Sequence, residues 1–168
     1  DDINVLAGDI PETRSRAVGM DCLVENMRWA AHEARAQGRR ILVEPLNRAG
    51  HRNYACRDTA EAMRVVEACR SDNVMLLYDV YHAQLTEGNV ISTLSRIMDR
   101  IGHVQIADVP TRGRPGTGEL NFTNIIGALV DLGYSGYVGL EYDPAGDADP
   151  LGWLPMSERA RTERAGGL

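Results

Sequence analysis

Several short apolar runs of this sequence end in a side chain that carries a carboxylate or amide oxygen. Glu44 ends ILVE, Asp79 ends LLYD, Glu141 ends VGLE, and the run HVQIAD carries Gln105 and then Asp108. A carboxylate at the exit of a buried strand costs free energy unless a cation, a hydrogen-bond network or a substrate compensates it. The chemistry open to these residues therefore depends on whether they converge in the fold.

Convergence follows if the runs are consecutive parallel strands, because their carboxyl ends then share one edge of the sheet. One buried carboxylate is more often a satisfied structural group than a ligand. Three or four at equivalent positions would repel one another strongly without a cation between them. Ligands that are all oxygen favour a hard divalent ion, Mg²⁺ or Mn²⁺. The pattern predicts a divalent metal site with Asp79 as a ligand, and it leaves Gln105 and Asp108 as rivals on one strand.

The elements that must position these residues alternate along the chain. Apolar strand candidates are followed by segments with an amphipathic helical stripe, and the strands are continuously rich in Val, Ile and Leu, as a parallel sheet covered by helices requires. The expected strands are 3–7, 40–45, 74–79, 103–108 and 137–142, and the expected helices are 18–37, 58–70, 89–101, 121–133 and a short one around 151–164. No long linker divides the chain, so 1–168 is expected to be one domain.

Composition excludes several classes of protein. The formal charge of −6 argues against a nucleic-acid partner, because phosphate binding needs clustered Lys and Arg. No apolar stretch approaches the roughly 18 residues of a membrane span, and the start of the chain has no signal-peptide pattern. The cysteines form no CxxC pair and are expected to be reduced, mostly buried thiols in a cytoplasmic protein.

Five blocks of sequence occur in an order and with a spacing that are typical of one known family. They are ILVEPLN (41–47), LLYDVYHAQLTEGN (76–89), IGHVQIADVP (101–110), PGTGELNF (115–122), and GYVGLEYDPAGD (136–147) with LGWL (151–154). Together they resemble the hydroxypyruvate isomerase family of the xylose-isomerase-like TIM barrels. The resemblance implies a (β/α)8 TIM-barrel type of α/β fold, here a partial barrel of about five parallel strand–helix units. INVLAG resembles the fourth strand, so the first three units are expected to be absent.

The resemblance also implies a set of metal ligands and two acid/base residues. A divalent metal ion, Mg²⁺ or Mn²⁺, would be held by Glu44, Asp79, Gln105 and Glu141. Only the resemblance selects Gln105 over its rival on the same strand. In related sugar epimerases a His stands at the matching place, so Gln105 points to the hydroxypyruvate isomerase branch. Glu44 and Glu141 match the residues that exchange protons with the substrate.

Two further residues match positions at which related enzymes contact substrate oxygens. They are His82, just past Asp79, and Arg112, in the loop after the Gln105 strand; Arg suits a carboxylate through bidentate hydrogen bonds. The structural alternatives are that Arg112 is solvated and that His82 only caps the following turn. Family members often carry His-Glu or Gly-Glu after that arginine, whereas this chain has Gly113 and Arg114, so details of this loop are expected to differ.

The activity implied is a metal-dependent isomerisation of hydroxypyruvate to tartronate semialdehyde through an enediolate. Sugar 3-epimerases and inosose dehydratases use the same barrel and are alternatives. An AP-endonuclease-like nuclease is disfavoured, because its metal cluster needs more His ligands and its DNA face needs positive charge. A non-enzymatic alternative is a truncated chain that binds a metal or a partner. Because five strands cannot close an eight-stranded barrel, we expect a homo-oligomer or low activity of the chain alone.

Overall fold

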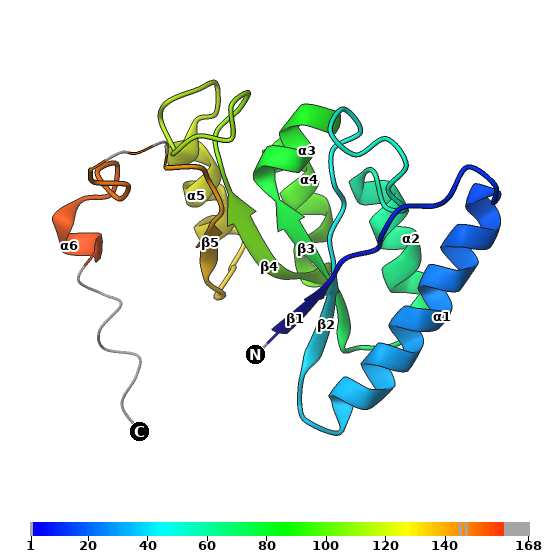
Figure 1. Cartoon of the computed structure of the whole chain (residues 1–168). Helices are drawn as coiled ribbons and strands as arrows, with labels where there is room; N and C mark the ends of the chain where they lie inside the picture. The colour runs from blue at the N-terminus through cyan, green and yellow to red at the C-terminus, as the bar shows by residue number, and fades with distance from the viewer. Residues whose placement is uncertain (1, 145, 147, 160–168) are drawn as a thin grey trace.

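The computed structural model describes residues 2–144, 146 and 148–159. Five parallel strands form one sheet in the order β1-β2-β3-β4-β5, and the helices that follow the first four strands lie along one side of it (Figure 1). The strands are β1 (Asp2–Val5), β2 (Arg40–Val43), β3 (Val74–Asp79), β4 (Ile101–Ile106) and β5 (Val138–Leu140). This confirms the expected partial TIM barrel with five parallel strands in chain order.

The helices follow the strands as the amphipathic stripes predicted. They are α1 (Arg16–Arg35), α2 (Thr59–Cys69), α3 (Val80–Thr86), α4 (Val90–Ile97) with the 3-10 turn η1 (Met98–Arg100), α5 (Phe122–Asp131) and α6 (Met156–Arg159). Of the helix expected around 151–164, the structure has α6, and residues 160–164 lie outside the described residues. The sequence analysis missed α3, which begins directly after β3 and is too short to show a helical period.

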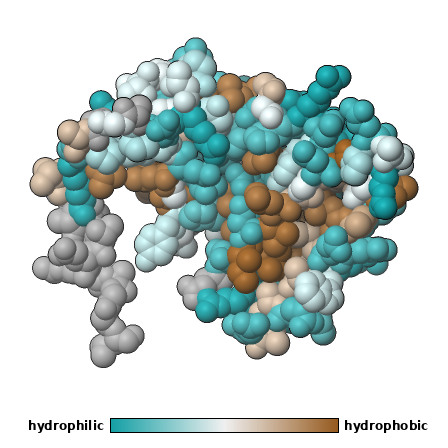
Figure 2. Space-filling view, in the orientation of Figure 1, coloured by the Kyte–Doolittle hydropathy of each residue, from teal (hydrophilic) through white to brown (hydrophobic). Residues whose placement is uncertain are grey.

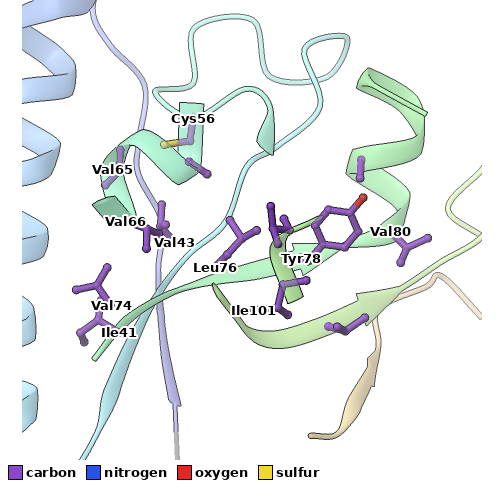
Figure 3. Packing of buried hydrophobic residues seen from close by; sticks show 14 of the residues in the cluster. Ile41, Val43, Cys56, Val65, Val66, Val74, Leu76, Tyr78, Val80 and Ile101 are labelled. Carbon is purple, nitrogen blue, oxygen red and sulfur yellow. The ribbon is translucent and has the colours of Figure 1, made fainter. Parts of the chain in front are cut away.

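The core lies between the sheet and the helices that cover its outer face. Alternate strand side chains point into it, so Val43 and Tyr78 are buried there with Val66 of α2 (Figure 3). On α4 the side chain of Ile91 is 40% exposed. The helix instead buries Val90, with Leu94 and Ile97 following at helical spacing.

The sheet is open at its two edges. Among the described residues, no strand pairs with the outer edge of β1 or of β5, and Ile3 of β1 is 47% exposed. Figure 2 shows an apolar area on the molecule near β1 and β2. An unpaired strand edge with apolar neighbours is a surface on which a further strand can be added.

Two expectations from composition concern the cysteines and membrane-spanning helices. Cys56 and Cys69 are buried and Cys22 is exposed, and all three are free thiols, as expected of a mostly buried, reduced set. Within the part of the chain that the structure describes, no helix combines the length and the apolar character needed to cross a membrane.

Candidate metal and substrate site

Strand alternation places the predicted ligands on the inner face at one end of the sheet. The residues concerned are Glu44, Asp79, Gln105 and Glu141, which lie at or just after the carboxyl ends of β2, β3, β4 and β5. Val43, Tyr78 and Val104, which immediately precede the first three, point into the outer core, so their successors face the other way. The strand register sets Asp79 directly opposite Gln105. The fold therefore brings together the residues that the sequence predicted.

Glu44 is a buried carboxylate with a single orienting hydrogen bond. Its side chain is almost inaccessible, and the Asn4 amide donates to Oε2 over 2.7 Å. Burial is the main cause that raises the pKa of Glu44 to about 7, and the nearby carboxylates of Asp79 and Glu141 raise it further. Glu44 can therefore gain or lose a proton close to neutral pH.

Asp79 offers one carboxylate oxygen to the protein and one to the site. Oδ1 accepts a 2.8 Å hydrogen bond from the backbone N–H of Tyr81 and so caps α3. Oδ2 is buried and has no hydrogen-bond partner among the described residues. Burial raises the pKa of Asp79 to about 6, with a further contribution from Glu141. A buried acceptor left open in this way needs an external cation or donor.

The structure distinguishes Gln105 from Asp108. Asp108 is buried, and its carboxylate accepts four backbone N–H bonds of 2.8–3.0 Å from the loop that follows β4; the donors are Val109, Gly116, Gly118 and Leu120. Its oxygens are thus fully used in shaping that loop. Gln105 Oε1, in contrast, is buried without a hydrogen-bond partner in the described part of the chain, which makes it the oxygen available to a ligand.

The donor set fits a divalent cation. Ligand atoms of Glu44, Asp79 and His82 all lie within 4.8 Å of one another, close enough to hold a metal ion. The open oxygens of Asp79 and Gln105 lie on adjacent strands of the same face, and carboxylate and amide oxygens suit Mg²⁺, Mn²⁺ and similar hard ions.

His82 lies inside α3 and faces the site. Asp79 is the N-cap of that helix, so the alternative that His82 merely caps the turn is wrong. The imidazole is buried, its Nε2 is 3.7 Å from Asp79 Oδ2, and its ring makes edge contacts with His51 and Tyr81. Burial lowers the pKa of His82 to about 4, with smaller contributions from Arg112 and His51, so the ring is neutral at pH 7.

Arg112 reaches back from the loop after β4 to the carboxylates. Its Nη2 is 3.0 Å from Glu141 Oε1 and 3.7 Å from Asp79 Oδ2, and its guanidinium lies 5.3 Å from the centre of the Tyr81 ring. The side chain is 35% exposed and pairs with these carboxylates. The alternative that Arg112 is only a solvated loop residue is therefore wrong. Glu141 is more open than the other predicted ligands, with 43% of its side chain exposed.

Sequence reasoning missed two asparagines that orient site residues. Asn4 of β1 donates to Glu44, and Asn47 contacts the His82 ring. Asn4 lies 40 positions from its partner and Asn47 lies 35 positions from His82. No local pattern connects residues so far apart, although Asn47 does lie within the ILVEPLN block.

Metal binding is expected to weaken as pH falls from about 8 to 5.5. Protons compete with the cation for Glu44, whose pKa is about 7, and for Asp79, whose pKa is about 6. Each carboxyl that must lose a proton reduces the apparent affinity about tenfold per pH unit below its pKa. Calorimetric titration with Mn²⁺ in two buffers should show proton release near pH 6.5. An affinity that stays constant over this range would contradict the assignment.

Gly118 is expected to be needed for the shape of the loop that carries Arg112. A Cβ at this position would lie 1.8 Å from the carbonyl oxygen of Val109 and 2.8 Å from Asp108 Oδ1, so Gly118→Ala must displace backbone. We expect a loss of about 1–3 kcal/mol in the free energy of unfolding, measured by chemical denaturation. Gly127→Ala is the matched control, because its Cβ would meet nothing within 4 Å. Equal stability of the two variants would contradict this account.

Comparisons with known proteins identify the family to which this fold belongs. A family model described as "Xylose isomerase-like TIM barrel" matches residues 2–161. The chain is 39% identical to a 2-oxo-tetronate isomerase of Cupriavidus necator over 92% of its own length and 60% of the relative's. It is 37% identical to the hydroxypyruvate isomerase of Escherichia coli, covering 84% of this chain and 55% of that protein.

Solved structures give the same picture. A crystal structure from Brucella melitensis, described as an AP endonuclease of family 2, superposes with a TM-score of 0.86 and 34% identity. The match covers 90% of this chain and 59% of that one. The chain therefore spans a little over half the length of these relatives.

Proposed function

The chain belongs to the xylose isomerase-like TIM barrel family, and on that premise we propose that its site serves a metal-dependent isomerase of a small keto acid, with hydroxypyruvate as the substrate. The observation that carries this proposal is the convergence of four oxygen-bearing side chains at one end of the sheet, with the open buried oxygens of Asp79 and Gln105 among them. Glu44, Asp79, Gln105 and Glu141 would hold the ion.

When bound, the divalent ion would act as a Lewis acid toward the keto and hydroxyl oxygens of the substrate. The chain's own part is proton transfer between neighbouring carbons. One of Glu44 and Glu141 takes a proton from the hydroxyl-bearing carbon, and the resulting enediolate receives a proton at the former keto carbon from the other. The hydroxyl proton of the substrate passes to the former keto oxygen, so that the hydroxyl-bearing carbon becomes the aldehyde. The product is tartronate semialdehyde, with no net gain or loss of atoms. The pKa of Glu44 near 7 suits a group that exchanges a proton at neutral pH.

His82 and Arg112 are the proposed substrate contacts. The neutral His82 ring faces Asp79 Oδ2 across 3.7 Å, and Arg112 already binds a carboxylate, that of Glu141, at 3.0 Å. A substrate carboxylate can bind to the same guanidinium through paired hydrogen bonds. Both side chains then orient the substrate over the proton-exchanging glutamates.

Arg112→Ala is expected to raise the KM for hydroxypyruvate by about ten- to a hundredfold, the loss that follows when one charge-assisted pair is removed. Steady-state kinetics at saturating metal would measure it. Arg64→Ala, which removes an exposed arginine of α2, is the matched control and should leave KM unchanged. An unchanged KM in Arg112→Ala would exclude the anchoring role.

The decisive experiment is an activity assay with hydroxypyruvate, with and without added Mg²⁺ or Mn²⁺, alongside the oligomeric mass. This assay and the kinetics of the variants use a lengthened version of the chain, extended at its N-terminal side with the matching part of a relative, because the chain itself spans only 60% and 55% of the two relatives named above. A parallel panel of 2-oxo-tetronate, ketohexoses and inososes separates the proposed reaction from those of isomerases, epimerases and dehydratases that act on longer substrates. Turnover of the longer substrates without turnover of hydroxypyruvate would show that hydroxypyruvate is not the substrate. Absence of metal dependence would reject the proposed mechanism.

A nuclease is the less favoured function, even though one structural neighbour is described as an AP endonuclease. The chain carries a formal charge of −6, and His82 is the one histidine in the cluster of ligand atoms found among the described residues. Binding to nucleic acid needs a positive surface. Cleavage of an abasic-site duplex by this chain would favour the nuclease function instead.

A further inference from the structure

Asn47 contacts His82 twice, and both contacts fall on the same ring nitrogen. The backbone N–H of Asn47 donates to Nδ1 over 3.0 Å, and the side-chain Nδ2 lies 2.8 Å from that atom. The backbone N–H of Gly50 donates to Asn47 Oδ1 over 2.7 Å, which turns the NH₂ end of the amide toward the imidazole. Both side chains are buried.

These contacts determine where the His82 proton resides. A backbone N–H can only donate, so Nδ1 must be an acceptor without a hydrogen. The imidazole then carries its proton on Nε2, the nitrogen that lies 3.7 Å from Asp79 Oδ2 and faces the site. An Nε2–H group donates a hydrogen bond and has no lone pair for a metal ion.

We propose that Asn47 is a positioning residue that keeps His82 as an Nε2–H donor to a substrate oxygen and prevents it from joining Glu44 and Asp79 as a metal ligand. The distance between these three residues would otherwise allow such a nitrogen ligand. Excluding it leaves an all-oxygen set, which favours hard ions over zinc. The substrate contact rests on the proposed function, whereas the tautomer is a property of the chain itself.

The tautomer can be tested on the unmodified protein without metal or substrate. Long-range ¹H–¹⁵N correlation spectra of ¹⁵N-labelled protein distinguish a protonated from an unprotonated ring nitrogen. We expect His82 to show an unprotonated Nδ1 and a protonated Nε2. A protonated Nδ1 would overturn the proposal, and this result would stand whether or not the protein isomerises hydroxypyruvate.

Asn47→Asp tests the side chain's own part. The carboxylate keeps the size of the amide and still accepts from Gly50, but it offers Nδ1 an acceptor in place of a donor. The backbone N–H remains in this variant, but a carboxylate 2.8 Å from Nδ1 repels its lone pair and attracts a proton there. We therefore expect Nδ1 to become protonated and turnover to fall about a hundredfold, as when one donor to a reacting oxygen is removed. Asn124→Asp, at an exposed position of α5, is the matched control for charge. It should change neither the His82 spectrum nor the turnover.

An unchanged His82 spectrum in Asn47→Asp would overturn the role of the side chain, because the backbone N–H alone would then hold the tautomer. If Asn47→Asp does not fold, the spectrum of the unmodified protein still decides the tautomer. If a version of the chain lengthened at its N-terminal side with the matching part of a relative lacks isomerase activity in the presence of metal, the proposed function fails while the spectra remain interpretable.

Discussion

Glu44→Gln and Glu141→Gln are each expected to lower turnover of hydroxypyruvate by about a hundred- to ten-thousandfold, the usual contribution of a positioned acid or base. Glutamine keeps the length and an oxygen for the metal but cannot exchange a proton. Steady-state kinetics at saturating Mg²⁺ or Mn²⁺, on the chain lengthened at its N-terminal side, would measure the loss. Glu25→Gln, at an exposed position of α1, is the matched control. Substantial turnover in either site variant would remove that residue from the acid/base role.

Glu44→Gln is also expected to stabilise the metal-free protein, which separates lost chemistry from lost folding. The folded pKa of Glu44, about 7, lies above its ordinary value of 4.5. The unfolded chain therefore releases this proton first, and stability is lost as pH rises through 7. At about pH 8 the buried charge costs on the order of 3 kcal/mol, at about 1.4 kcal/mol per pKa unit, and glutamine avoids that cost. Denaturation curves at pH 5 and 8 should show a gain at pH 8 that shrinks at pH 5.

A polypeptide limited to these 168 residues is expected to have little or no isomerase activity, although it presents all four proposed ligands. A site of this kind works when its ligands are held within about half an ångström by packed neighbours. Here β1 and β5 are edge strands within the described residues. Glu44 follows β2, next to one edge, and the half-exposed Glu141 follows β5 at the other. Backbone opening costs least at such edges.

The test compares this chain with a longer version that extends its N-terminal side with the corresponding part of a relative, such as the 2-oxo-tetronate isomerase, of which the chain spans 60%. Metal and protein concentrations are matched, and oligomeric mass is measured in parallel. We expect turnover to be at least about a hundredfold higher in the longer version. Comparable turnover in both, with the short chain monomeric, would contradict this prediction. Activity in a short-chain dimer would indicate that a second copy closes the sheet.

The sequence by itself was enough to predict the five parallel strands and which residues the fold would bring together at their carboxyl ends. A buried strand needs a continuous apolar run, and VMLLYD marks β3 to the residue. The cost of burying a carboxylate at the end of such a run must be compensated, and Glu44, Asp79 and Glu141 stand at these ends. Because parallel strands point the same way, their exits predict spatial convergence without any knowledge of distant contacts.

The residue pattern left Gln105 and Asp108 as rivals, and a family resemblance alone selected Gln105. The tertiary structure supplies the physical difference, which lies in which oxygens already have partners. Asp108 is satisfied by backbone groups as far as 12 positions away, whereas Gln105 Oε1 is left open within the described chain. The tautomer of His82 likewise depends on Asn47, 35 positions distant. Apolar periodicity is a local property that can be read along the chain. The satisfaction of a buried polar atom is decided by residues that meet only once the chain has folded.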